Sequence, residues 1–168
     1  MTDDIAVGYL LSLAEISGVF VGFGALIGAL QSREKRDIQK AGMIASVCVI
    51  GLVTLLGCLI PLLLSGFNFN NIWFYSSLTF LIIIGIAFGL AYFYPSYGGG
   101  NPIEFSKHPV ASLIFWVLLE LPIQASLLCN IFGFLPQHAS ALYLTAIIFN
   151  FAESGFFLVM IVFDRESH

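Results

Sequence analysis

Charged residues are scarce in this sequence. They make up 10% of its 168 residues, whereas about 25% is usual in soluble domains. From Ala41 to Ile103 there is a run of 63 residues without a single Asp, Glu, Lys or Arg. Hydrophobic residues make up 59% of the chain, and the mean hydropathy is +0.98. A water-soluble fold cannot bury such a run, so the composition excludes an ordinary soluble enzyme and predicts an integral membrane protein.

Residue types that would support other functions are also sparse. There are only six Lys and Arg residues and no basic stretch typical of nucleic-acid binding, so we expect no nucleic-acid partner. Cys48, Cys58 and Cys129 lie in apolar segments without C-x-x-C spacing and are interpreted as small packing residues. His108 lies at the start of the fourth predicted span and His138 at the start of the fifth. These two ends are on opposite faces of the membrane, so the two residues cannot share a metal. We therefore expect no metal, no cofactor and no enzymatic nucleophile.

Five apolar segments are present, and each is long enough for a membrane-spanning helix of about 20 residues. They cover residues of about 5–30, 41–64, 72–94, 110–132 and 138–163. Gly, Asn and Pro residues separate them, as expected for turns. Helices satisfy their own backbone in lipid, so we predict an all-α bundle of five transmembrane helices that forms one domain over residues 1–168.

The positions of the basic residues predict the orientation. Four lie in the first loop, one in the third loop and one in the tail: Arg33, Lys35, Arg36, Lys40, Lys107 and Arg165. With five spans these three regions lie on one side of the membrane, which the positive-inside rule makes the cytoplasm. We predict an outside N-terminus and a cytoplasmic C-terminus. The basic first loop is interpreted as a contact for lipid headgroups or for a cytoplasmic protein partner.

Three acidic residues lie inside the predicted spans, and no Lys or Arg accompanies them. Glu15, Glu120 and Glu153 each stand ten residues from one end of their span, at Ile5, Val110 and Phe163. At about 1.5 Å per residue, all three lie about 15 Å deep, near the midplane. A charge there costs at least about 2.5–3.5 kcal/mol, so such residues are usually functional or paired.

Each glutamate has polar neighbours at helical spacing. The candidates for a proton, ion or polar-solute path are Glu15, Glu120, Glu153, Gln124, Asn150, Ser12, Ser154 and Tyr143. Pro122 is expected to kink its helix beside Glu120 and to free a carbonyl. Protonated carboxyls could instead act as hydrogen-bonded links between helices. The sequence leaves both interpretations open.

Three glycine pairs have GxxxG spacing, which allows close helix approach in membranes. They are Gly18 and Gly22, Gly24 and Gly28, and Gly85 and Gly89. Glycine is common in membrane helices, so such spacing also occurs without a packing role.

The segment Ala14-Glu-Ile-Ser-Gly-Val-Phe-Val-Gly-Phe-Gly24, followed by a basic loop, resembles the opening of small bacterial polytopic membrane proteins with no assigned activity. The resemblance covers the first span and its loop. It implies a bacterial inner-membrane location and a role for Glu15, Gly18 and Gly22.

Together these features favour a small homo-oligomeric channel or transporter for protons, cations or a small polar solute. One alternative is a membrane scaffold, sensor or effector subunit that docks a partner through the first loop. Another is an intramembrane enzyme acting on lipid, which would need a carboxylate pair such as Glu120 and Glu153 within reach across helices.

Overall fold

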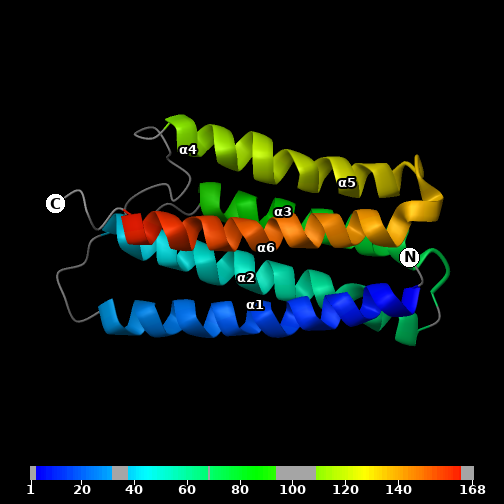
Figure 1. Ribbon diagram of the computed structural model, residues 1–168, viewed down its shortest axis with the longest axis horizontal. Coiled ribbons are helices and arrows are strands. Elements are labelled where there is room, and N and C mark those ends of the chain that lie inside the picture. The colour runs from blue at the N-terminus through cyan, green and yellow to red at the C-terminus, as the bar shows by residue number, and fades with distance from the viewer. Residues whose placement is uncertain (1–2, 32–37, 68, 94–108, 164–168) are drawn as a thin grey trace.

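The computed structural model describes residues 3–31, 38–67, 69–93 and 109–163, and within them every regular element is a helix. The five candidate membrane spans form helical rods that lie side by side (Figure 1). Each rod contains a helix long and apolar enough to cross a membrane, as predicted from the sequence.

The rods extend the predicted spans by a few residues at most. In chain order the elements are α1 (Asp3–Gln31), α2 (Ile38–Gly66), α3 (Ile72–Phe93), α4 (Pro109–Leu113), η3 (Ile114–Glu120), α5 (Leu121–Ile131), η4 (Pro136–His138) and α6 (Ala139–Phe163). The fourth rod is composite, because η3 is a π-helix between two α-helical parts, a feature that the sequence analysis did not predict.

Two helices occupy the middle of the bundle. α2 packs against α1, α3 and α6, and α6 also contacts α5, η3 and α3. α1 lies at the edge, where it packs along α2 and more lightly on α6 (Figure 1). Among the described residues, one side of α1 therefore has no neighbouring helix.

Tight turns join the rods at the end where α1 begins. After α5, Gly133 adopts a positive φ of 65°. The Phe134 amide donates to the Cys129 carbonyl at 3.1 Å and the Gly133 amide to the Asn130 carbonyl at 3.2 Å, which together form a Schellman cap. Before α3, Asn71 has φ 60°, and its carbonyl accepts from the Phe74 amide at 3.0 Å.

A proline inside α2 explains one bond between helices. Pro61 has no N–H, so the carbonyl of Gly57, four residues earlier, lacks its usual helical donor. The Tyr143 hydroxyl of α6 donates to that carbonyl at 2.7 Å. An added Cβ at Gly57 would lie 2.5 Å from Phe80, so only glycine allows this close approach.

The buried apolar side chains form two clusters. The larger contains Leu10, Val53, Phe80, Ile123, Tyr143 and Ile147 among others, and the smaller contains Ile44, Val47, Phe115, Leu119 and Phe157. The first lies toward the end where α1 begins, and the second toward the opposite end. Along the central helices, buried polar residues stand between the two clusters, and that layer is the candidate site.

Candidate functional site

The polar layer contains two of the three predicted glutamates. Glu120 is the last residue of η3, and Glu153 lies in the second half of α6. Glu120 stands eleven residues from both Pro109 and Ile131, which is about 16 Å from each end of its rod. The side chains of Glu120 and Glu153 are 7% and 1% exposed, so both carboxyls are buried in the middle of the bundle.

The two carboxyl groups lie within hydrogen-bonding reach of each other. As carboxylates, Glu120 Oε2 and Glu153 Oε1 have no hydrogen-bond donor. Two anions in contact repel, and neither can donate, whereas a proton held between them supplies the missing donor. The geometry therefore fits a carboxyl pair that shares at least one proton.

The other oxygen of each carboxyl faces an amide. Gln124 Nε2 donates to Glu120 Oε1 at 2.6 Å, one helical turn further along the rod. Asn150 Nδ2 donates to Glu153 Oε2 at 3.3 Å from the preceding turn of α6. One oxygen of each carboxyl thus accepts from an N–H group, and the other oxygen has no donor.

Thr54 of α2 extends this network to a third rod. Its hydroxyl lies 2.9 Å from Asn150 Oδ1 and 2.9 Å from the Ile50 carbonyl. A hydroxyl has one hydrogen, so Thr54 can donate to only one of these two acceptors at a time. The hydroxyl can therefore change acceptor without a movement of the backbone.

Thr54 is not among the candidates predicted from the sequence. It is nevertheless the polar residue nearest the middle of the second span, so its depth along that span is a signal that points to it.

The π-helix lies directly before the pair. η3 ends at Glu120, and the Leu121 amide donates to the Trp116 carbonyl, five residues earlier. Pro122 follows at the start of α5 and offers no amide to the preceding turn. The kink expected at Pro122 takes the form of this wider helical register. π-helical turns are often found at functional sites.

The other polar candidates on α6 contact the backbone of α2. Ser154 Oγ donates to the Val47 carbonyl at 3.3 Å, next to the polar layer. Tyr143 is bonded to the Gly57 carbonyl and is separated from Asn150 by the buried Ile147. Ser154 thus borders the carboxyl pair, whereas Tyr143 belongs to the apolar cluster.

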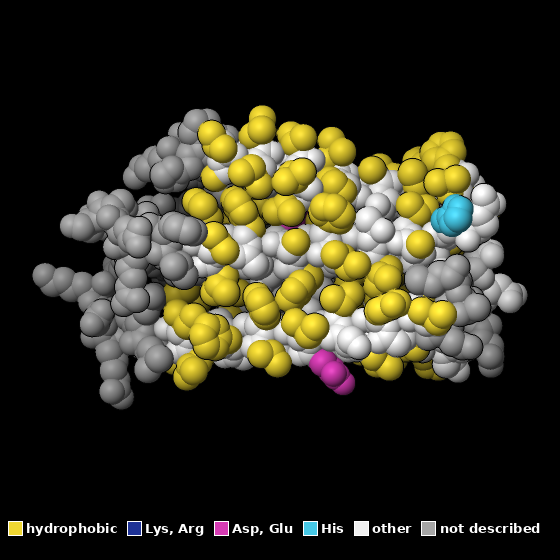
Figure 2. Space-filling model, viewed as in Figure 1, with side chains coloured by type: hydrophobic (Ala, Val, Ile, Leu, Met, Phe, Trp, Pro, Cys, Tyr) yellow, Lys and Arg dark blue, Asp and Glu magenta, His cyan; other side chains and the backbone are white. Residues whose placement is uncertain are grey.

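Glu15 does not join the pair. It is exposed on α1, and Ser12, also exposed, donates to the Gly8 carbonyl of its own helix at 3.1 Å. Figure 2 shows an acidic side chain projecting from the largely apolar surface of the bundle. The sequence predicts one depth for the three glutamates, but only two of them converge in the structure.

The predicted glycine pairs differ in their surroundings. An added Cβ at Gly24 would lie 2.8 Å from Cys48 Sγ, and one at Gly28 would lie 3.5 Å from Ile44, so this pair packs against α2. A Cβ at Gly18 would lie 3.6 Å from Leu55. A Cβ at Gly22, Gly85 or Gly89 would meet nothing within 4 Å, so these three mark no helix contact in the part of the chain that the structure describes.

The structure does not describe the side chains of the basic first loop. Arg33, Lys35 and Arg36 lie outside the described residues. Lys40 lies in the first turn of α2, and its side chain is outside the described part.

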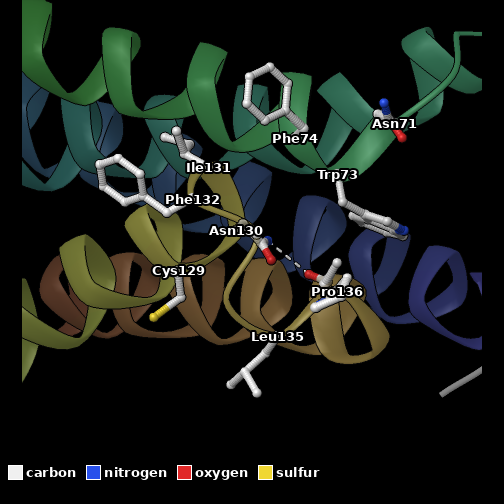
Figure 3. Close-up of a pocket in the computed structure, with 11 residues that line it drawn as sticks. Asn71, Trp73, Phe74, Cys129, Asn130, Ile131, Phe132, Leu135 and Pro136 are labelled. Atoms are coloured by element: carbon white, nitrogen blue, oxygen red, sulfur yellow. Dashed lines mark hydrogen bonds between the residues drawn. The ribbon is translucent and has the colours of Figure 1, made fainter.

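A cavity of about 350 Å³ lies at the end of the bundle where α3 and α6 begin, between Trp73, Phe132 and Asn130 (Figure 3). Asn130 Nδ2 lies 2.9 Å from the Ala139 carbonyl and 3.1 Å from Ser77 Oγ, so it ties α5 to α6 and α3. Asn130 is ten residues beyond Glu120, about 15 Å along the rod. The cavity is therefore separate from the carboxyl pair.

Among the described residues, no three His, Cys, Asp or Glu side chains gather as metal ligands. The layer offers a pair of carboxyls, two amides and a hydroxyl, and this set can bind, hold and release a proton. Comparison of the chain with protein-family models, with curated proteins and with solved structures found no match.

Proposed function

We propose that this protein moves protons across a membrane and that Glu120 and Glu153 form its proton-binding site. The observation that carries the proposal is the contact of two buried carboxyls at mid-span, with no Lys or Arg in any of the five candidate spans. Ionisable groups at this depth mark proton and ion paths in membrane proteins.

The hydrogen-bond pattern favours a proton over a larger cation. Metal cations such as Ca²⁺ need six or more oxygen ligands directed at one point. Here Gln124 and Asn150 direct N–H groups at the carboxyls. The oxygens that remain, Glu120 Oε2 and Glu153 Oε1, lack a donor, and a proton on either carboxyl would supply one.

The π-helix supplies a means of separating the pair. If residues of η3 returned to α-helical bonding, Glu120 would rotate relative to Glu153, because π-helical hydrogen bonds join residues five apart and α-helical bonds join residues four apart. The proton would then leave the pair toward whichever side is hydrated. The apolar clusters on both sides of the layer keep that path closed in the present conformation.

The orientation and location belong to the same proposal. The six-to-zero distribution of Lys and Arg supports an outside N-terminus and a cytoplasmic C-terminus. The resemblance of the first span supports a bacterial inner membrane. Impermeant thiol labelling of single cysteines placed in the first loop and in the 133–137 turn tests the orientation. The turn should react from outside and the loop only after lysis.

Catalysis on a lipid is less well supported. The carboxyl pair that it requires is present, but a lipid headgroup has no open approach to side chains that are 7% and 1% exposed.

Proton flux into proteoliposomes with a trapped pH-sensitive dye tests the proposal. Glu120→Gln and Glu153→Gln keep the side-chain shape but remove the acid. A positioned proton-transfer group usually contributes about 10²–10⁴-fold, so we expect each variant to slow flux by at least about tenfold. Thr145→Val is the matched control, because the Thr145 hydroxyl bonds only to the Ala141 carbonyl of α6. Parent liposomes no leakier than empty ones, or glutamine variants that conduct like the parent, would overturn the proposal.

A further inference from the structure

The outer face of α1 carries an acidic residue without a partner. Glu15 is exposed in the middle of α1, and no hydrogen bond or ion pair joins its carboxyl to another described residue. Hydrocarbon surrounds an exposed residue at this depth, and a carboxyl there lacks both water and a donor. An isolated acid at this position is therefore incomplete within one protomer.

The same face is shaped for close contact. Gly8 and Gly22 stand seven residues before and after Glu15, and an added Cβ on either glycine would meet nothing within 4 Å. A seven-residue spacing keeps side chains on one side of a helix that crosses a parallel neighbour at a shallow angle. The glycines leave space above and below Glu15 into which a neighbouring helix can fit.

The opposite face of α1 is already occupied. Leu10, Ser17 and Gly24, again seven residues apart, are buried against the rest of the bundle. Each of them follows Gly8, Glu15 or Gly22 by two residues, which is about 200° around the helix. The Glu15 face therefore points directly away from α2 and from the carboxyl pair.

We infer that this face binds a second copy of the chain and that two Glu15 carboxyls hydrogen-bond across the contact. Two copies of one sequence insert in the same orientation, so a symmetric contact places both Glu15 side chains at the same depth. A protonated carboxyl donates and accepts, and it is thus complementary to itself. No candidate span of this chain offers a cation instead. The inference does not depend on the proposed proton movement.

Disulfide crosslinking in bilayers at high dilution tests the contact. The three native cysteines are first replaced by alanine, and single cysteines are then placed at Ser12 and Gly22. Val117, exposed on η3, is the control position. We expect crosslinked dimers from positions 12 and 22 and none from position 117.

The hydrogen bond between the two Glu15 carboxyls is tested by the dimer dissociation constant, which is measured by energy transfer between labelled copies. Glu15→Gln keeps a self-complementary side chain and should change the constant little. Glu15→Leu removes the polar contact and should weaken association by about tenfold, the effect of one to two kcal/mol for a membrane hydrogen bond. Gly22→Leu should weaken it as well, and the open space at Gly22 lets the protomer fold unchanged. Circular dichroism verifies that fold.

The inference would be overturned by a parent chain that stays monomeric in bilayers, by dimers that crosslink as readily from position 117, or by a Glu15→Leu variant that associates as tightly as the parent. Association that appears only with another membrane protein carrying a mid-span Lys or Arg would also contradict it.

Discussion

Substitutions at Glu153 should show whether the stability of the protein depends on the shape of this side chain or on its acidic group. In Glu153→Gln the new amide can donate to Glu120 Oε2, which has no donor when both residues are carboxylates. The contact between two acids is replaced by an amide–carboxyl hydrogen bond. Such bonds contribute about 0.6 to 1.7 kcal/mol in membranes. We expect the free energy of unfolding to stay the same or rise by up to about 2 kcal/mol.

Glu153→Leu should act in the opposite direction. It removes the acceptor of Asn150 Nδ2, at 3.3 Å, and leaves Glu120 without its facing group. Each unsatisfied buried polar group costs about 1–3 kcal/mol, so a loss of about 2–5 kcal/mol is expected. Reversible unfolding of the purified protein in mixed micelles, followed by circular dichroism, measures both variants against the parent. If the glutamine variant is destabilised as much as the leucine variant, the two carboxyls do not face each other and the reasoning fails.

Other predictions concern the packing around the site. Gly57→Ala should lower the free energy of unfolding by about 1–3 kcal/mol, because its Cβ would lie 2.5 Å from Phe80. Gly85→Ala, where nothing lies within 4 Å, should leave stability unchanged or raise it by up to about 1 kcal/mol, and the same micelle unfolding assay compares them. Tyr143→Phe removes the hydroxyl that donates to the Gly57 carbonyl, which Pro61 leaves without an amide donor. It should lower the free energy of unfolding by about 1–2 kcal/mol. We expect this loss to be smaller than that of Gly57→Ala and the helical content to stay unchanged. Asn130→Ala breaks two bonds between rods and should speed amide hydrogen exchange in the 133–137 turn without changing proton flux; slower flux would link the turn to the site.

The sequence predicted the depth of the polar residues but not their direction. Composition is enough to locate five spans, and the rise per residue predicts one level for Glu15, Glu120 and Glu153. The direction of a side chain depends on the rotation of its helix. In a soluble helix the polar face reveals that rotation, but a membrane helix is apolar on its lipid side and on its packed side. Glu15 and Glu153 therefore look alike in sequence, although one is exposed and the other is buried.

Two structural features depend on neighbours that the sequence does not identify. Pro61 predicts an unpaired carbonyl at Gly57, but its donor, Tyr143, comes from a helix 86 residues away in sequence. Pro122 predicts a disturbed helix, but not that the disturbance takes the form of a π-helix over Ile114–Glu120. In both cases proline chemistry marks the place, and packing decides how the backbone group is satisfied.

Infrared spectroscopy of the carboxyl groups tests the central claim most directly. The protein is measured in lipid at neutral pH as Glu15→Gln, so that Glu120 and Glu153 are the acids left within the candidate spans. We predict the carbonyl band of a protonated carboxyl, slow to exchange in heavy water because the pair is buried. This band should be absent when Glu120→Gln and Glu153→Gln are both added. A spectrum without a protonated carboxyl, or a band that persists in the triple variant, would contradict a shared proton at mid-membrane.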